Sequence, residues 1–285
     1  MLKEKKNRKF IFILPSILFI IFLVYIPFIY SLIMSLYYGR GNNLKFSFFK
    51  NYSLLFNDDV FNKVILNSLT FTIIIVPIII LFSLYVSYIL LNIKSEKTKN
   101  IFTTLLYIPC ITSPVAYSLF FKQLAYNDGI LSSIFNNFNI LGNVWSARLY
   151  ISLICIWAWS GYYILFLFTA IKNVDVNLYK AAKLDGASNF KIFRKIVIPL
   201  VKPVLILMTI LVIIGTFQLF VESSLITKGG PSMGTYSIVH YLYNRAFVYV
   251  SQYGYASALG ILVFLFCLIV SIPFVKRMIK DENTL

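Results

Sequence analysis

Residues 64–91 read VILNSLTFTIIIVPIIILFSLYVSYILL and contain no Asp, Glu, Lys or Arg. A helix needs roughly 20 mostly apolar residues to cross the hydrocarbon core of a bilayer. This segment is longer than that. It also lacks the strict alternation of polar and apolar residues that is typical of membrane barrel strands. The segment therefore predicts a membrane-spanning helix, and it indicates that the chain is a helical membrane protein.

Five further segments meet the same criterion, at residues 10–38, 101–121 with a continuation to 125, 149–171, 201–227 and 255–275. Of the 285 residues, 59% are hydrophobic and 13% are charged, with a mean hydropathy of +0.82. Soluble domains have roughly 45–50% apolar and about 25% charged residues, so the composition argues against a soluble enzyme. The first apolar run is too long for a cleaved signal peptide, and we expect a retained helix.

The basic residues predict the orientation of the chain. The sequence has 26 Lys and Arg against 10 Asp and Glu. Eighteen of the 26 lie at the two termini, in 94–99 and in 172–202, and only eight lie in the alternate loops. Cytoplasmic loops are enriched in Lys and Arg, so we expect a multi-pass membrane protein with both termini in the cytoplasm. Short basic clusters between spans indicate contact with the lipid bilayer and no nucleic-acid partner.

The sequence offers no pattern for covalent chemistry. It has no phosphate-binding G-x-x-x-x-G-K-[ST] loop that could bind ATP. It has a single histidine, His240, and its three cysteines are far apart within apolar runs. We therefore predict no catalytic residue, no metal site and no cofactor.

The loop at 172–202 carries the most specific pattern. Asp175 is a good N-cap for a helix over 176–184, and the Asp185-Gly186 pair would end that helix. Ser188 would begin a second, amphipathic helix that ends at Pro199. We expect one face of the first helix to contain Leu178, Ala181 and Ala182.

Two interpretations of this loop follow from the residues alone. A helix with a small-residue face can lie in a groove on a partner protein. An amphipathic helix can also lie in the headgroup region and only anchor the loop to the membrane.

A resemblance favours the first interpretation. The run LYKAAKLDGA at 178–187, followed by Phe193 and by Ile198-Pro199, resembles the EAA loop of binding-protein-dependent ABC importer permeases. That motif reads roughly L-Y-E-A-A-x-x-D-G-A, and in the family it forms the coupling helix that docks on the ATPase. The resemblance assigns ATPase coupling to Leu178, Tyr179, Lys180, Ala181, Ala182, Asp185, Gly186, Ala187, Phe193 and Pro199. Two residues depart from the motif, because Asp175 replaces a common proline and Lys180 replaces the glutamate, which reverses a charge at the ATPase contact.

Further segments are similar to the carbohydrate-importing branch of the family, at residues 10–16, 106–114, 215–218, 229–231 and 253–258. The resemblance implies an all-α, type I permease with six transmembrane helices in a bacterial-type cell (plasma) membrane. Its expected parts are an N-terminal region (1–63), a permease core (64–276) and a C-terminal tail (277–285). The implied partners are a dimer of ABC ATPase subunits, a second and different permease, an extracytoplasmic binding protein and a carbohydrate. The alternative substrate is another small polar solute such as glycerol phosphate.

Five side chains are candidates for the substrate pathway. Gln218 and Glu222 are four residues apart and would share a helix face. A carboxylate within a span normally faces the bundle or a watery cavity, although Glu222 could instead lie among the headgroups. Asn67 could line the pathway or bond between helices. Trp157 and Tyr162 could stack on a sugar, or face lipid.

Two other classes of protein remain as alternatives. A stand-alone secondary transporter would need intramembrane charges and usually repeated halves, and neither feature is evident in the sequence. A membrane enzyme would need a cluster of acids, bases or nucleophiles inside the bundle. We therefore expect a transporter subunit that does no chemistry itself, with ATP hydrolysis on a partner.

Overall fold

A computed structural model describes residues 12–41, 43–126, 129–134, 139–248 and 251–282. Within this part of the chain, five helices are long and apolar enough to span a membrane, at Phe12–Met34, Asp59–Asn92, Val144–Lys172, Lys202–Leu225 and Tyr253–Met278. A bent pair of helices supplies a sixth span if it is counted as one. The prediction of a polytopic helical protein is confirmed. The basic residues expected at 3–9 lie outside the described residues.

The span predicted at 101–125 is broken in the structure. The structure has two helices there, α5 (Glu96–Ile111) and α6 (Pro114–Ala125), which are bent by 89°. The cause is Pro114, because a proline disfavours helical backbone in the residue before it. Ser113 accordingly has a ψ of 127°. By contrast, Pro77 and Pro273 lie inside unbroken helices.

The chain forms two compact units. The first comprises residues 1–61 and 242–265. It holds the helix Phe12–Met34, which includes η1 (Ile21–Tyr25) and α2 (Ile26–Met34), then strands β1 (Tyr37–Arg40) and β2 (Asn43–Phe46), helix α3 (Lys50–Phe56), the turn η3 (Asn244–Val248) and the first part of α15 (Tyr253–Glu282). The β1–β2 hairpin was not predicted, because a pair of four-residue strands is too short to give a periodic signal.

Polar side chains hold the first unit together. The Asn51 amide donates hydrogen bonds to the Ser35 and Tyr37 carbonyls, at 2.8 and 2.9 Å. Asp58 accepts from Arg245 at 3.1 Å and from the Tyr255 hydroxyl at 2.5 Å. These bonds join α3 to the start of the hairpin and Asp58, just after α3, to η3 and the start of α15, which are far apart in sequence.

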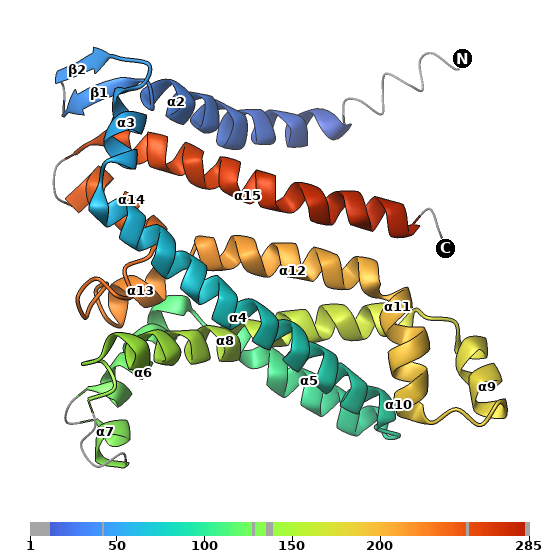
Figure 1. The fold of residues 1–285 in the computed structure, drawn as a ribbon. Coiled ribbons are helices and arrows are strands. Elements are labelled where there is room, and N and C mark those ends of the chain that lie inside the picture. Colours follow the sequence, from blue (N-terminus) through green and yellow to red (C-terminus); the bar gives the residue numbers. More distant parts are fainter. Residues whose placement is uncertain (1–11, 42, 127–128, 135–138, 249–250, 283–285) are drawn as a thin grey trace, which may run out of the picture. The chain divides into compact units, whose positions relative to one another are not determined.

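The second unit comprises residues 62–241 and 266–285. It holds α4 (Asp59–Asn92) beyond its first turn, α5, α6, α7 (Ile130–Ile134), α8 (Val144–Lys172), α9 (Val176–Leu184), α10 (Asn189–Ile192), η2 (Phe193–Val197), α11 (Ile198–Leu200), α12 (Lys202–Phe217), α13 (Val221–Leu225) and most of α14 (Ile238–Tyr243) (Figure 1). Among the five long spanning helices, α8 is the most buried, because α5 and α12 pack on it.

Gly161 explains how closely α5 approaches α8. A Cβ atom at this position would overlap the backbone carbonyl of Leu106 on α5. The absence of a side chain therefore lets the two helices meet backbone to backbone, as small residues do in membrane bundles. The Cys110 sulfur also accepts from the Tyr162 backbone N–H at 3.1 Å.

Candidate functional site

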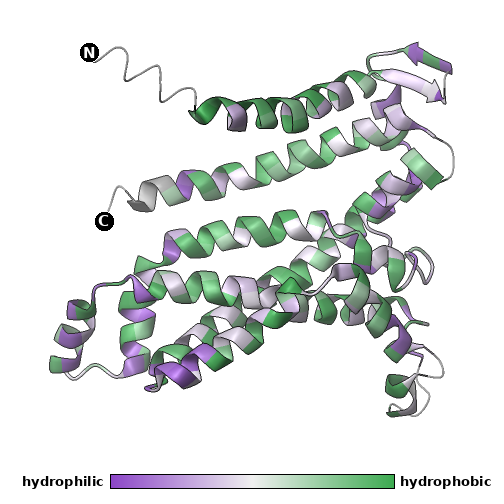
Figure 2. Cartoon of the chain, turned by 180° about the vertical axis from the view of Figure 1, so that it is seen from behind, coloured by the Kyte–Doolittle hydropathy of each residue, from purple (hydrophilic) through white to green (hydrophobic). Residues whose placement is uncertain are grey.

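The loop between α8 and α12 begins with a capped helix, as its sequence predicts. The Asp175 carboxylate accepts a hydrogen bond from the Asn177 N–H at 2.9 Å, and α9 follows directly. A side-chain oxygen at this position satisfies one of the N–H groups that have no partner within the helix. Hydrophilic residues gather along α9, α10 and the start of α5, whereas the spanning helices are mostly apolar (Figure 2).

The end of α9 is fixed by the backbone around Gly186. This residue has a φ of +74°, which glycine adopts without steric cost. The Ala187 N–H donates to the Ala182 carbonyl and the Gly186 N–H to the Lys183 carbonyl, both at 3.0 Å, which is the pattern of a Schellman motif. The exposed Asp185 contributes through its backbone N–H, which donates to the Ala181 carbonyl at 3.1 Å.

The second helix starts and ends close to where the sequence predicts. Ser188 caps it by accepting from the Lys191 N–H at 3.3 Å. The predicted end at Pro199 agrees to within one residue, since α11 ends at Leu200 and the chain turns at Val201. Pro199 lies in the first turn after the wider π-helical turn η2, where proline is tolerated without its N–H. Phe193 is buried in this helix.

The predicted shared face of Leu178, Ala181 and Ala182 is also wrong in part. Ala182 is 9% exposed and belongs to the main apolar cluster of the second unit, together with Phe193 and, at its edge, Tyr179 and Ala187. Ala181 and Leu178 are exposed. Successive residues are rotated by about 100° around a helix, so Ala182 can turn inward while Ala181 stays outside. The exposed apolar side chains of α9 include Leu184, at 89% exposed.

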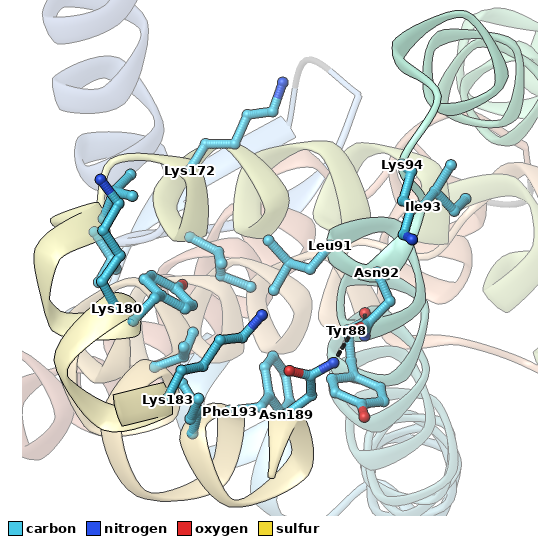
Figure 3. A pocket seen from close by; sticks show the side chains of 16 residues that line it. Tyr88, Leu91, Asn92, Ile93, Lys94, Lys172, Lys180, Lys183, Asn189 and Phe193 are labelled. Carbon is cyan, nitrogen blue, oxygen red and sulfur yellow. Dashed lines mark hydrogen bonds between the residues drawn. The ribbon is translucent and has the colours of Figure 1, made fainter. Parts of the chain in front are cut away.

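A pocket of about 550 Å³ lies on another side of α9. Its walls are the end of α4, the end of α8, and α9 with α10 and η2. Four lysines line it, Lys94, Lys172, Lys180 and Lys183, together with apolar residues such as Leu91, Ile171 and Phe193 (Figure 3). The Asn189 amide donates to the Asn92 side-chain oxygen at 3.0 Å and so links α10 to the end of α4.

Tyr179 lines the same pocket. Burial raises the pKa of its hydroxyl above the ordinary value. The hydroxyl oxygen is buried and has no hydrogen-bond partner among the described residues. An unpaired buried polar group costs free energy, so this hydroxyl is unfavourable in the isolated chain.

The candidate pathway residue Asn67 is fully engaged inside the second unit. It is 1% exposed, and its amide nitrogen donates to the Met233 carbonyl at 2.7 Å and the Tyr236 carbonyl at 3.0 Å. Its side-chain oxygen accepts from Arg148 at 2.6 Å, and Arg148 also donates to the Gly234 carbonyl at 2.7 Å. This arrangement favours an anchoring role for Asn67, in which α4 and α8 hold the loop that precedes α14.

Glu222 is buried and accepts a hydrogen bond from the Tyr117 hydroxyl. The Tyr117 ring in turn meets Trp157 edge-to-face, with ring centroids 6.1 Å apart. The structure thus groups two pathway candidates, Glu222 and Trp157, around one tyrosine of α6. The alternative of Glu222 among the headgroups is not supported by its burial.

The prediction that Gln218 shares a helix face with Glu222 is wrong. The helix stops between them, because α12 ends at Phe217 and α13 begins at Val221. Gln218 is exposed on the surface of this chain. Tyr162 is also exposed, and its ring stacks on Phe166 with centroids 6.2 Å apart.

Sequence reasoning missed several of these residues. Arg148, Lys94 and Lys172 were counted only as orientation signals, although their positions next to helix ends could have suggested surface sites. No local signal identifies Tyr117 as the partner of Glu222. No group of three or more potential metal-ligating His, Cys, Asp or Glu side chains occurs within the part of the chain that the structure describes.

Comparison with known proteins identifies sequence relatives. The profile described as binding-protein-dependent transport system inner membrane component matches residues 63–276. The lactose transport system permease protein LacF of Rhizobium radiobacter is 35% identical over 272 residues, covering 92% of this chain and 90% of that protein. The arabinooligosaccharides transport system permease protein AraP of Bacillus subtilis is 30% identical over 286 residues, covering 96% of this chain and 89% of that protein.

The fold is similar to solved structures. A chain of a bacterial ABC transporter involved in the import of the acidic polysaccharide alginate superposes with a TM-score of 0.85 at 18% identity, over 97% of this chain and 96% of that chain. A second structure, with an alginate pentasaccharide-bound periplasmic protein, gives a TM-score of 0.83 over 95% and 93% of the two chains, also at 18% identity. At this identity the likeness establishes the architecture.

Proposed function

The chain belongs to the family of binding-protein-dependent transport system inner membrane components, and we propose that it forms half of the pathway of an ATP-driven sugar importer. It has the fold of a type I ABC importer permease and is a multi-pass membrane protein. The lactose and arabinooligosaccharide relatives support a sugar or oligosaccharide as the substrate. Because that support comes from relatives, another small polar solute such as glycerol phosphate is the alternative.

One observation supports the coupling role of the loop most strongly. The helix α9 has a side-chain cap at its start and a Schellman motif at its end, so its shape is defined by its own residues. It nevertheless leaves Leu178, Ala181 and Leu184 uncovered in this chain. In the proposed complex, this outer face docks on one ATPase subunit. ATP binding and hydrolysis on the ATPase dimer then shift the two permeases between inward and outward access.

A substitution on the outer face tests the docking. Ala181→Leu enlarges an exposed side chain, so it should leave the isolated chain folded while it overpacks the interface by about 1–3 kcal/mol. The measurements are co-purification of the ATPase and substrate-stimulated ATP hydrolysis, and both should fall. Ala116→Leu, at an exposed alanine of α6, is the matched control and should leave both unchanged.

Four further variants separate docking from folding of the loop. Ala182→Leu and Gly186→Val should disturb the loop itself, because the first residue is buried and the second has a positive φ. Asp185→Lys reverses an exposed charge and should affect docking alone, whereas Lys180→Glu restores the residue of the family motif. If Ala181→Leu and Asp185→Lys both transport normally with the ATPase bound, α9 only anchors the loop and the coupling assignment is wrong.

The substrate is tested by binding and uptake. The binding protein of the system should bind a di- or oligosaccharide tightly, and uptake of that sugar should require this permease, its second permease and the ATPase. Tight binding of glycerol phosphate with no sugar bound would support the alternative. Uptake that continues without an ATPase would instead indicate a secondary transporter.

The proposed orientation has a direct test. With both termini in the cytoplasm, reporter fusions at Lys97 and at Lys183 should report a cytoplasmic location. A fusion at Asn136 should report an external location, and this position lies outside the described residues. An external signal at Lys183 would exclude ATPase docking through α9.

A further inference from the structure

We propose that the pocket lined by Lys94, Lys172, Lys180 and Lys183 binds the phosphate headgroup of an anionic phospholipid. The pocket lies within the second unit and is formed by the ends of two spanning helices together with the α9–η2 hairpin. This inference concerns a lipid site and does not depend on which solute the importer carries.

The charges of the pocket favour an anion. All four lysines are exposed, and among the described residues that line the pocket none is acidic. Lys172 forms a long ion pair with Glu96, at 3.9 Å. Glu96 also forms a closer ion pair with Lys99, at 2.6 Å. Four lysine side chains line one cavity, so a bound anion lowers the electrostatic free energy of the site.

The position of the pocket favours a lipid as the source of the anion. Lys172 is the last residue of the spanning helix α8, and Lys94 follows the spanning helix α4 by two residues. Both residues therefore lie at the polar ends of spanning helices, and in the proposed orientation these ends face the cytoplasmic headgroups. Basic pockets between transmembrane helices on the cytoplasmic side are known to bind anionic headgroups.

The lining of the pocket also matches an amphiphile. Leu91, Ile171 and Phe193 give it an apolar floor beside the charged rim. In Figure 3 the Lys183 side chain extends from α9 toward Leu91 and Asn92, so one ammonium group reaches across this floor. A phosphodiester on the lysines with its glycerol and first methylenes on the floor would satisfy both surfaces.

Helix geometry separates this pocket from the proposed ATPase contact. Val176, Tyr179, Lys180 and Lys183 line the pocket, and at about 100° per residue they share one side of α9. Ala181 lies well away from that side on the helix circumference and is exposed. An ATPase that docks on Ala181 therefore leaves the pocket free for lipid.

The test measures lipid retention by the purified full chain. The chain is reconstituted in nanodiscs of equimolar phosphatidylglycerol and phosphatidylcholine, and retained lipid is counted by native mass spectrometry. The double variant Lys94→Gln, Lys183→Gln should lower retained phosphatidylglycerol about 25-fold, since each lysine contributes roughly fivefold, equivalent to about 1 kcal/mol. The control Lys191→Gln, Lys195→Gln removes two exposed charges of the same hairpin that do not line the pocket, and should have little effect.

Several outcomes would overturn the proposal. Unchanged phosphatidylglycerol retention in the pocket variant is one, and equal loss in the control is another. Displacement of the lipid by millimolar inorganic phosphate would identify free phosphate as the ligand. Loss of ATPase co-purification with lipid retention intact would assign the lysines to acidic side chains of the ATPase. Circular dichroism of each variant checks that its helical content is preserved.

Discussion

Replacing Asn67 with leucine should loosen the loop between α13 and α14 and leave substrate recognition unchanged. Leucine has nearly the same size but neither donates nor accepts. The substitution removes the hydrogen bonds that Asn67 donates to the Met233 and Tyr236 carbonyls. It also removes the hydrogen bond that Asn67 accepts from Arg148 at 2.6 Å. Ser232 and Met233 have φ values of 49° and 60°, which are unfavourable for residues with a side chain. Such backbone persists only where its surroundings hold it in place.

The magnitude follows from which groups lose a partner. The hydrogen bond from Asn67 to the Tyr236 carbonyl is buried, and a buried carbonyl that loses its partner costs about 1–3 kcal/mol. The hydrogen bond to the Met233 carbonyl is only partly buried, and Arg148 keeps its hydrogen bond to the Gly234 carbonyl. The loss of these two Asn67 contacts therefore adds less to the free-energy cost. We expect a local destabilisation of about 2–4 kcal/mol, which corresponds to amide exchange roughly 30- to 700-fold faster.

Hydrogen exchange measured by mass spectrometry is the suitable assay, because it reports on individual segments. Peptides covering 229–241 should lose protection, and peptides from α8 should keep it. Asn62→Leu makes the same change at an exposed position of α4 and should leave exchange in the loop unchanged. If Asn67→Leu leaves the loop protected but weakens uptake of the substrate, then Asn67 lines the pathway and the anchoring interpretation is wrong.

Three further predictions concern single side chains of the second unit. Glu222→Gln should preserve the fold, because its side-chain oxygen can still accept from the Tyr117 hydroxyl. Tyr117→Phe leaves the buried Glu222 carboxylate with one donor fewer and should lower stability by about 1–3 kcal/mol. Equal melting temperatures of the two variants would contradict this. Gly161→Ala should destabilise the chain through its clash with α5, whereas Gly215→Ala, where the nearest atom is 3.8 Å away, should raise the melting temperature or leave it unchanged. Burial lowers the pKa of His240 to about 4. As the pH falls from about 6.5 to 4, the unfolded state takes up a proton that the folded state does not, so up to about 3 kcal/mol of folding stability is lost. His240→Asn should abolish this part of the pH dependence in a denaturation series.

The sequence by itself determined the features that depend on neighbouring residues. Apolar length predicted the spans, because the thickness of the bilayer sets how many residues must be apolar. Capping chemistry predicted both ends of α9, since the Asp175 carboxylate and the Gly186 backbone act within a few residues of their partners. The motif in the loop predicted the family for the same reason, as its residues are contiguous.

The tertiary structure alone decided how these elements meet. Tyr117 and Glu222 are 105 residues apart, and Asn67 lies 166 residues before the Met233 carbonyl it binds. Periodicity also placed Ala182 on one face with Leu178 and Ala181, whereas in the structure Ala182 is buried in the same apolar cluster as Phe193. No local pattern records such pairings, because side chains find these partners only when distant helices pack together. The number of basic residues in each loop predicts the orientation of the chain, but only the tertiary structure shows that four of the lysines line one pocket.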